Sequence, residues 1–188
     1  MVKRGLLCLL LSVVLLAGCV SDWGTMHVTD PAQYGKVESY ITVPACFPDV
    51  IEEYTVNAYS YTLYSYMDVC YEIFLNLTVT QEQLQTLLSD IRQLSGWREQ
   101  EAWYAEGYCE IVFHDSYSLC PDSAQKTNLS NVWNARIEKV VYHPQTGHIV
   151  FESLNAFDSV VYPLSEVAFF NCFGITQERY VNHIWMTV

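Results

Sequence analysis

The sequence predicts an α+β fold in which one long amphipathic helix packs on one face of an antiparallel sheet, forming a two-layer sandwich. Apolar and polar residues alternate over residues 69–79, which is the period of a half-buried strand. Apolar residues then recur at helical spacing over residues 84–94. The other strand-like segments follow one another through short turns, and this favours antiparallel pairing.

The first strands are expected within residues 51–79, which are rich in Tyr, Val, Thr, Ile and Phe, the residue types that favour strands. A break near Ser65–Asp68 divides this segment into two predicted strands. In the second strand, every other residue from Val69 to Val79 is apolar, so that face is expected to lie in the core.

The helix that follows has start and stop signals. Thr80 and Gln83 have the spacing of a capping box, in which each side chain binds the other residue's backbone N–H. Gly96 supplies the stop. These limits predict a helix of about 15 residues with a single apolar stripe. The stripe, interpreted as core, consists of Leu84, Leu87, Leu88, Ile91 and Leu94.

The second half of the domain is expected to be mostly strands. Residues 97–106 are interpreted as a loop or short helix, Tyr108–His114 as a strand and residues 115–131 as a long surface loop. A hairpin follows, with strands at residues 135–143 and 148–155.

Three more elements are expected toward the C-terminus. Leu164–Phe173 is predicted to be a short helix that Gly174 ends. Ser159–Tyr162 is a possible edge strand, and Tyr180–Val188 is apolar enough to form a last strand.

The N-terminus has the layout of an export signal. Lys3 and Arg4 form a basic start, and an uncharged, Leu- and Val-rich run follows from Gly5 to Leu15. This run is shorter than the about 20 apolar residues that a membrane-spanning helix needs. It ends in Leu16-Ala17-Gly18-Cys19, which resembles the lipobox of bacterial lipoprotein precursors. In that family the cysteine receives lipid and becomes the mature N-terminus.

The resemblance implies an exported protein that lipid on Cys19 anchors to the outer face of a bacterial cell membrane. Residues 1–18 would be the signal peptide. Residues 19–44 have no clear period and are interpreted as a tether, with a short helical piece around Lys36–Ile41, and residues 45–188 as a single α+β domain. A flexible tether of about twenty residues spans about 25 Å, enough to lift the domain from the membrane.

The charge of the chain argues against a nucleic-acid partner. Without Lys3 and Arg4 the chain has 7 basic and 21 acidic residues, which gives a net charge of −14. Such a surface repels phosphate backbones, and the simplest interpretation is that it keeps an exported domain soluble.

The cysteines do not suggest a disulfide framework. Cys8 leaves with the signal and Cys19 is the lipid site, so five cysteines remain, and at least one is unpaired unless it pairs between molecules. A disulfide between Cys109 and Cys120, the nearest pair in sequence, is one possibility. Otherwise these residues are interpreted as small buried side chains.

Tyrosine gives the only conspicuous enrichment, and six of the 14 tyrosines lie within residues 54–71. Tyr59 and Tyr61 are therefore candidate ligand-binding residues for a peptide, glycan or protein, because Tyr combines an apolar ring with a polar tip. Strand propensity alone explains much of the same enrichment.

Metal chemistry has weak support in the sequence. His143 and His148 flank the predicted hairpin turn and would need a third ligand to hold zinc. Cys109, His114 and Cys120 form a second loose cluster, whose spacing fits no zinc pattern. Structural zinc normally takes four ligands, so no metal is expected. No cofactor is expected either.

Two hypotheses for function follow. The first is a non-catalytic binding or assembly module, because no nucleophile elbow, zinc-protease motif, phosphate-binding loop or EF-hand is present. The alternative is a small hydrolase that acts on cell-wall glycan or peptide and uses carboxylates near Trp97 and Trp103, since glycosidases need two carboxylates. The candidate carboxylates are Glu99, Glu101, Glu106 and Glu110.

Overall fold

The computed structural model describes residues 25–36, 43–65, 69–119, 132–156 and 164–175. The strands are β1 (Thr25–Val28), β2 (Thr55–Ser65), β3 (Val69–Thr78), β4 (Arg98–Glu101), β5 (Cys109–Leu119), β6 (Val132–Tyr142) and β7 (His148–Ala156). The helices are the 3-10 turn η1 (Pro31–Gln33) and the α-helices α2 (Gln81–Gln93) and α3 (Leu164–Phe173).

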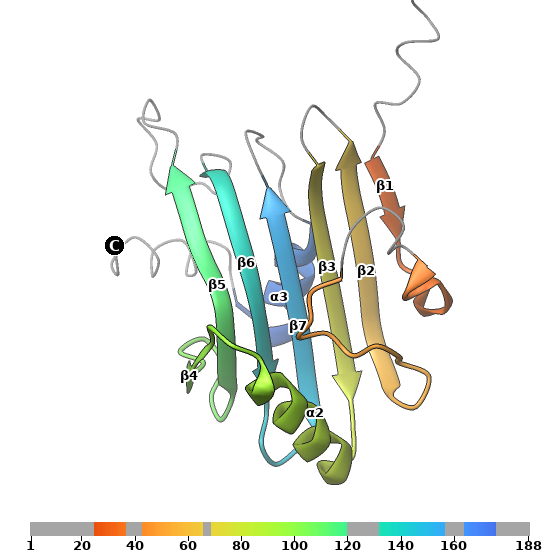
Figure 1. Cartoon of the computed structure of the whole chain (residues 1–188), viewed down its shortest axis with the longest axis vertical. Coiled ribbons are helices and arrows are strands. Elements are labelled where there is room, and N and C mark those ends of the chain that lie inside the picture. The colour runs from red at the N-terminus through yellow and green to blue at the C-terminus, as the bar shows by residue number, and fades with distance from the viewer. Residues whose placement is uncertain (1–24, 37–42, 66–68, 120–131, 157–163, 176–188) are drawn as a thin grey trace, which may run out of the picture.

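All seven described strands form one antiparallel sheet (Figure 1). The strand order is β1-β2-β3-β7-β6-β5-β4, so hairpins join β2 to β3 and β6 to β7, and β3 pairs with β7 to join the two hairpins. This confirms the predicted antiparallel sheet with helices. The predicted break between residues 65 and 68 also agrees with the observed ends of β2 and β3.

Helix α2 starts as the sequence predicts. The Thr80 hydroxyl accepts a hydrogen bond from the Gln83 backbone N–H at 3.2 Å, and the Gln83 side chain accepts one from the Thr80 N–H at 2.8 Å. Its apolar stripe packs on one face of the sheet, against Ile73, Leu75 and Phe151 among others. The stripe residues that are buried are Leu84, Leu87, Leu88 and Ile91.

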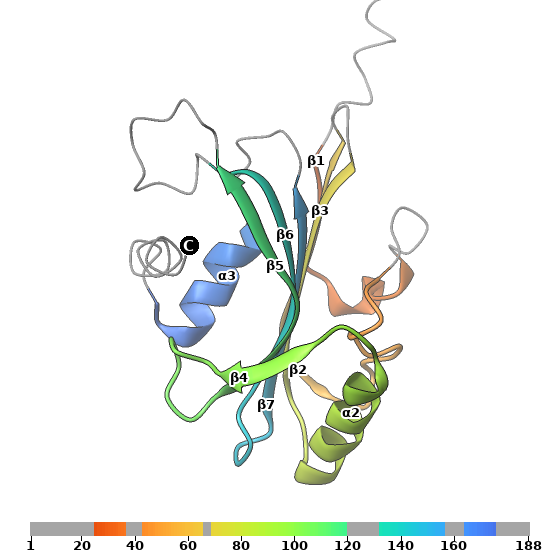
Figure 2. The same cartoon turned by 60° about the vertical axis from the view of Figure 1, so that its left-hand side comes forward.

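Helix α3 covers the opposite face of the sheet (Figure 2). Phe169 on this helix is buried with Phe74, Val141 and Val150. These three residues point away from α2, because each alternates along its strand with residues of the α2-side core. The single helix and two-layer sandwich are therefore not confirmed, since the central strands bury apolar side chains on both faces.

Three segments differ from the expected structure. Thr25–Val28, expected within the tether, pairs with β2 at the edge of the sheet. Arg98–Glu101, expected in a loop or short helix, pairs with β5 as the opposite edge strand. Strand β5 continues to Leu119, into the segment expected as a surface loop. These short or polar stretches carry no apolar period, so pairing with a neighbouring strand determines their structure.

Several expectations lie outside the described residues. They are the export signal, Cys19, residues 37–41, Cys120 and the possible strands at 159–162 and 180–188. Within the described residues, no helix is long and apolar enough to cross a membrane. Cys46, Cys109 and Cys172 are free thiols there.

Candidate functional site

Tyr59 and Tyr61, the candidate ligand-binding residues, lie inside the core. Their exposed fractions are 4% and 0%, and both pack in the cluster beneath α2. Burial raises the pKa of Tyr59 to about 12. The structure therefore places both rings in the core and not on a ligand-binding surface. Their contact with a ligand stays a prediction. Strand propensity, the alternative in the sequence, agrees with their positions in β2.

His143 and His148 lie on either side of the β6–β7 turn, and the His143 N–H donates to the His148 carbonyl at 2.9 Å. The ring that comes between them is Tyr108, whose centroid is 4.9 Å from that of His143 and 5.6 Å from that of His148. Among the described residues, no group of three or more His, Cys, Asp or Glu could hold a metal ion.

His148 is the centre of a polar network that sequence reasoning missed. Its Nδ1 lies 2.8 Å from the Tyr108 hydroxyl, and its Nε2 lies 2.8 Å from Oδ1 of Asn76. Because Oδ1 only accepts, Nε2 carries the proton, and Nδ1 accepts from Tyr108. The Asn76 amide in turn donates to Sγ of Cys172 at 3.0 Å. The network joins the β4–β5 loop, β3, β7 and α3.

The proton positions in this network oppose nucleophilic catalysis. Sγ of Cys172 is 3.8 Å from Nε2 of His148, as in a loose Cys–His pair. That nitrogen already carries a proton, so it does not accept one from the thiol. Burial also raises the pKa of Cys172 to about 11, which keeps the thiol protonated at neutral pH. We therefore interpret the network as a clamp that holds α3 and the β4–β5 loop on the sheet.

The network predicts a pH dependence of stability. Burial, and then the nearby His143, lower the pKa of His148 in the folded protein, whereas the unfolded chain has the ordinary value near 6.5. The unfolded state therefore binds more protons as the pH falls through that value, and the free energy of unfolding should decrease. Urea denaturation at pH 7.5 and pH 5.5 measures this. His148→Gln should reduce the decrease, and an identical decrease in both proteins would contradict the assignment.

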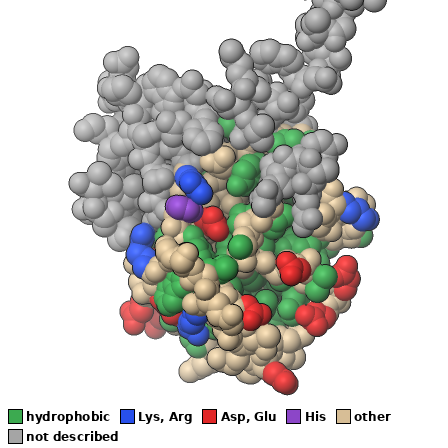
Figure 3. Space-filling model, in the orientation of Figure 1, with side chains coloured by type: hydrophobic (Ala, Val, Ile, Leu, Met, Phe, Trp, Pro, Cys, Tyr) green, Lys and Arg blue, Asp and Glu red, His purple; other side chains and the backbone are tan. Residues whose placement is uncertain are grey.

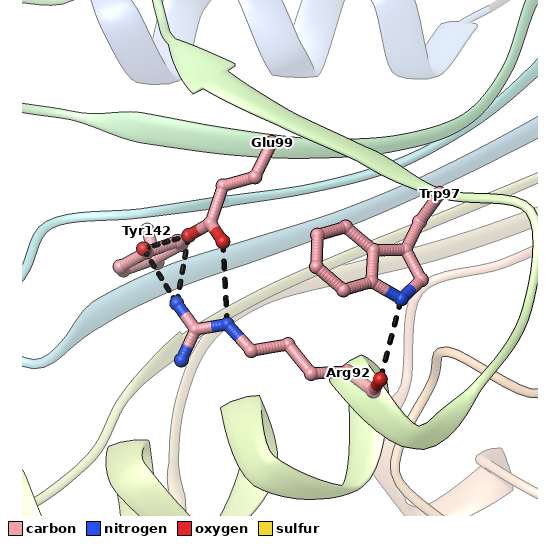
Figure 4. A network of polar contacts seen from close by, with 4 residues as sticks. All are labelled: Arg92, Trp97, Glu99 and Tyr142. Atoms are coloured by element: carbon pink, nitrogen blue, oxygen red, sulfur yellow. Dashed lines mark hydrogen bonds and ion pairs between the residues drawn. The ribbon is translucent and has the colours of Figure 1, made fainter.

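Glu99, one of the candidate carboxylates, is engaged in a structural contact (Figure 4). Both of its oxygens accept hydrogen bonds from the Arg92 guanidinium, at 2.7 and 3.2 Å, and the Tyr142 hydroxyl also donates to it. The bonds from Arg92 lower the pKa of Glu99. The indole of Trp97 donates to the Arg92 carbonyl at 3.3 Å. These contacts attach the C-terminal end of α2 to β4 and β6.

Glu110 lies on the other face of the sheet and is 5% exposed. It accepts hydrogen bonds from the Tyr104 hydroxyl at 2.7 Å and from Gln100, its cross-strand partner, at 2.5 Å. Glu101 follows Gln100 in β4 and therefore points to the opposite face. The structure thus does not bring Glu101 and Glu110 together as the carboxylate pair that a glycosidase needs.

A pocket of about 590 Å³ lies at the β4–β5 loop. Trp103 and Tyr108 are half-buried there, and Tyr104 is buried. Glu101 and Glu106 are exposed. The lining is continuous in sequence, and its described residues are Glu101, Ala102, Trp103, Tyr104, Ala105, Glu106, Gly107, Tyr108 and Cys109.

Two residues of the pocket wall, Tyr104 and Tyr108, are fixed by contacts with the sheet and with α3. Tyr108 belongs to the His148 network, and Tyr104 is fixed by Glu110 and by the rings of Phe169 and Phe173 in α3 at 5.5 and 5.6 Å. Gly107 lies so close to the hairpin that a Cβ there would be 3.0 Å from Nε2 of His143. A loop that the sheet and α3 both support is well suited to hold a ligand in one geometry.

The chain matches no known family model, and searches of curated proteins and of solved structures found no significant match. The function is therefore inferred from the residues themselves. Trp103, Glu101 and Glu106 are among the residues that the sequence offered for the alternative hydrolase. The signal for a pocket was the density of Trp, Tyr and Glu within residues 101–109.

Proposed function

We propose that this protein is a lipid-anchored, non-catalytic binding module on the outer face of a bacterial cell membrane. Its ligand is held in the pocket of the β4–β5 loop and is a small molecule or one group of a peptide, glycan or protein. The observation that carries this proposal is the pocket itself, with aromatic rings in its wall that the fold fixes from behind. A binding site needs a concave surface with a few anchors, and these are often aromatic.

The surface charge agrees with a binding role that does not involve nucleic acid. On the face that Figure 3 shows, the carboxylates are spread singly among apolar and neutral side chains, and they form no continuous patch. The whole chain has a formal net charge of −12. A cationic or neutral ligand therefore approaches more easily than a phosphate chain does.

The anchor is tested by lipid labelling. The basic start, the short apolar run and the Leu16–Cys19 segment predict that Cys19 carries fatty acid. Bacterial cells that produce the protein are fed labelled palmitate, and wild type is compared with Cys19→Ser. We expect label and membrane association in the wild type only. Cys8→Ser is the matched control and should be labelled like wild type, whereas equal label in the Cys19 variant would disprove the anchor.

The binding role is tested by what the pocket retains. The protein is recovered from producing membranes, washed and denatured, and the molecules that it releases are identified by mass spectrometry. At least one compound should be enriched on wild type and lost from Trp103→Ala, because the variant removes a ring of the pocket wall. Val50→Ala, an exposed residue of the loop before β2, is the control. The same set of compounds on wild type and Trp103→Ala would contradict the proposal.

A hydrolase remains the second candidate because Glu101 lines the pocket. Its partner would have to be a carboxylate other than Glu99 or Glu110, since the first binds Arg92 and the second is buried against Tyr104. Glu106, also in the lining, is the carboxylate that this alternative would use.

A further inference from the structure

We infer that the pocket of the β4–β5 loop recognises an organic cation, an ammonium group on a small molecule or on a peptide side chain. This inference rests on the proposed binding function and names its ligand class. Three aromatic residues and two carboxylates line the pocket, and the described lining contains no Lys or Arg. Aromatic faces attract ammonium groups through the negative charge of their π-systems, and neighbouring carboxylates add ordinary charge attraction.

The ring of Tyr104, in the pocket wall, already lies next to an ammonium group of the protein itself, that of Lys139. Nζ of Lys139 lies 5.7 Å from the centroid of Tyr104 and 4.0 Å from that of Phe169. That ammonium is 3.0 Å from a Glu152 oxygen, so the protein's own buried cation is held by rings together with a carboxylate. The pocket lining offers the same two kinds of group, with Trp103 and Tyr108 as rings and Glu101 and Glu106 as carboxylates.

The hydrogen bonds behind the rings strengthen this preference. The Tyr104 hydroxyl donates to the buried Glu110 carboxylate at 2.7 Å, and the Tyr108 hydroxyl donates to Nδ1 of His148 at 2.8 Å. A phenol that donates its proton to an acceptor becomes richer in electron density, and an electron-rich ring binds a cation more strongly. The same bonds also fix the rings before the ligand arrives, which lowers the entropy cost of binding.

The test compares cations with neutral molecules of the same shape. The full-length lipidated protein in a non-ionic detergent is titrated by calorimetry with choline and with 3,3-dimethylbutan-1-ol. A second pair, N-acetyl-lysine methylamide and its norleucine counterpart, distinguishes a peptide side chain from a small free cation. In at least one pair the cation should bind about tenfold more tightly or better than its neutral partner.

Two variants locate the effect. The double variant Glu101→Gln with Glu106→Gln changes exposed side chains only, so it should fold, and it should weaken the cation while leaving the neutral partner unchanged. Trp103→Leu should weaken both. Asp49→Asn, an exposed carboxylate in the loop before β2, is the matched control and should bind like wild type.

The outcomes distinguish a failure of the cation inference from a failure of the proposed binding function. Equal affinity for cation and neutral partner, or no binding of either cation, overturns the inference. The proposed function then still stands if wild type retains a compound from the membranes that Trp103→Ala loses. If neither the Glu101 and Glu106 double variant nor the Trp103 variants change the binding of any compound, the cation inference and the proposed binding function are both wrong.

Discussion

Gly147→Ala is expected to destabilise the protein by about 2–5 kcal/mol. Gly147 ends the β6–β7 turn with a φ of +71°, where a residue with a Cβ is strained by roughly 1–2 kcal/mol. A Cβ there would also lie 2.0 Å from the Val79 carbonyl oxygen. That oxygen belongs to the backbone between β3 and α2, so a shift disturbs the start of the helix, and such overpacking costs about 1–3 kcal/mol.

The matched control is Gly96→Ala. Gly96 has a similar φ of +83°, but a Cβ there would have no atom within 4 Å. It should therefore show the backbone strain alone, about 1–2 kcal/mol. Urea denaturation of both variants measures the difference. Equal destabilisation would mean that the turn does not press against the β3–α2 junction, although the Val79 N–H donates to the Gly147 carbonyl at 2.9 Å.

Leu88→Ala should cost about 2–5 kcal/mol, because the side chain is 2% exposed and its removal leaves a cavity between α2 and the sheet. Gln85→Ala, on the exposed side of the same helix, should change the free energy of unfolding by less than about 0.5 kcal/mol. Thermal or urea unfolding of the two variants tests the helix assignment. Similar shifts in both would contradict it.

The parts of the fold that local signals determine could be predicted from the sequence. Helix α2 is an example, because Thr80 and Gln83 cap each other within one turn and the stripe from Leu84 to Ile91 has a clear period. The limits of α3 were also predictable, since Gly174 follows the helix directly. Which face of the sheet α3 covers was not, because most residues of Leu164–Phe173 are apolar and the sequence therefore marks no single face of the helix.

The candidate site was harder to predict because its contacts join distant parts of the chain. Asn76 and His148 are 72 residues apart, and Asn76 and Cys172 are 96 residues apart. No spacing rule connects such residues before the sheet order is known. Tyr59 and Tyr61 show the opposite problem, since a strand-favouring ring with a polar tip looks the same in sequence whether the core or a ligand covers it.

The roles of Glu99 and Glu110 depended on the register of β4 against β5. The sequence places both among the same run of acidic residues. The pairing of Gln100 with Glu110 then puts them on opposite faces, one bound to Arg92 and the other buried against Tyr104. Strand β4 has four polar residues and no alternation, so this register could be found only in the folded sheet.

The central claim, that the pocket binds without catalysis, is tested most directly by incubating the purified protein with cell-wall glycan and peptide fragments. Mass spectrometry over several hours follows the fragments that bind and any products. We predict that bound fragments are recovered with unchanged mass and that Trp103→Ala retains fewer of them. Shortened products that form with wild type, and that Glu101→Gln or Glu106→Gln abolishes, would contradict the account and make the protein a hydrolase.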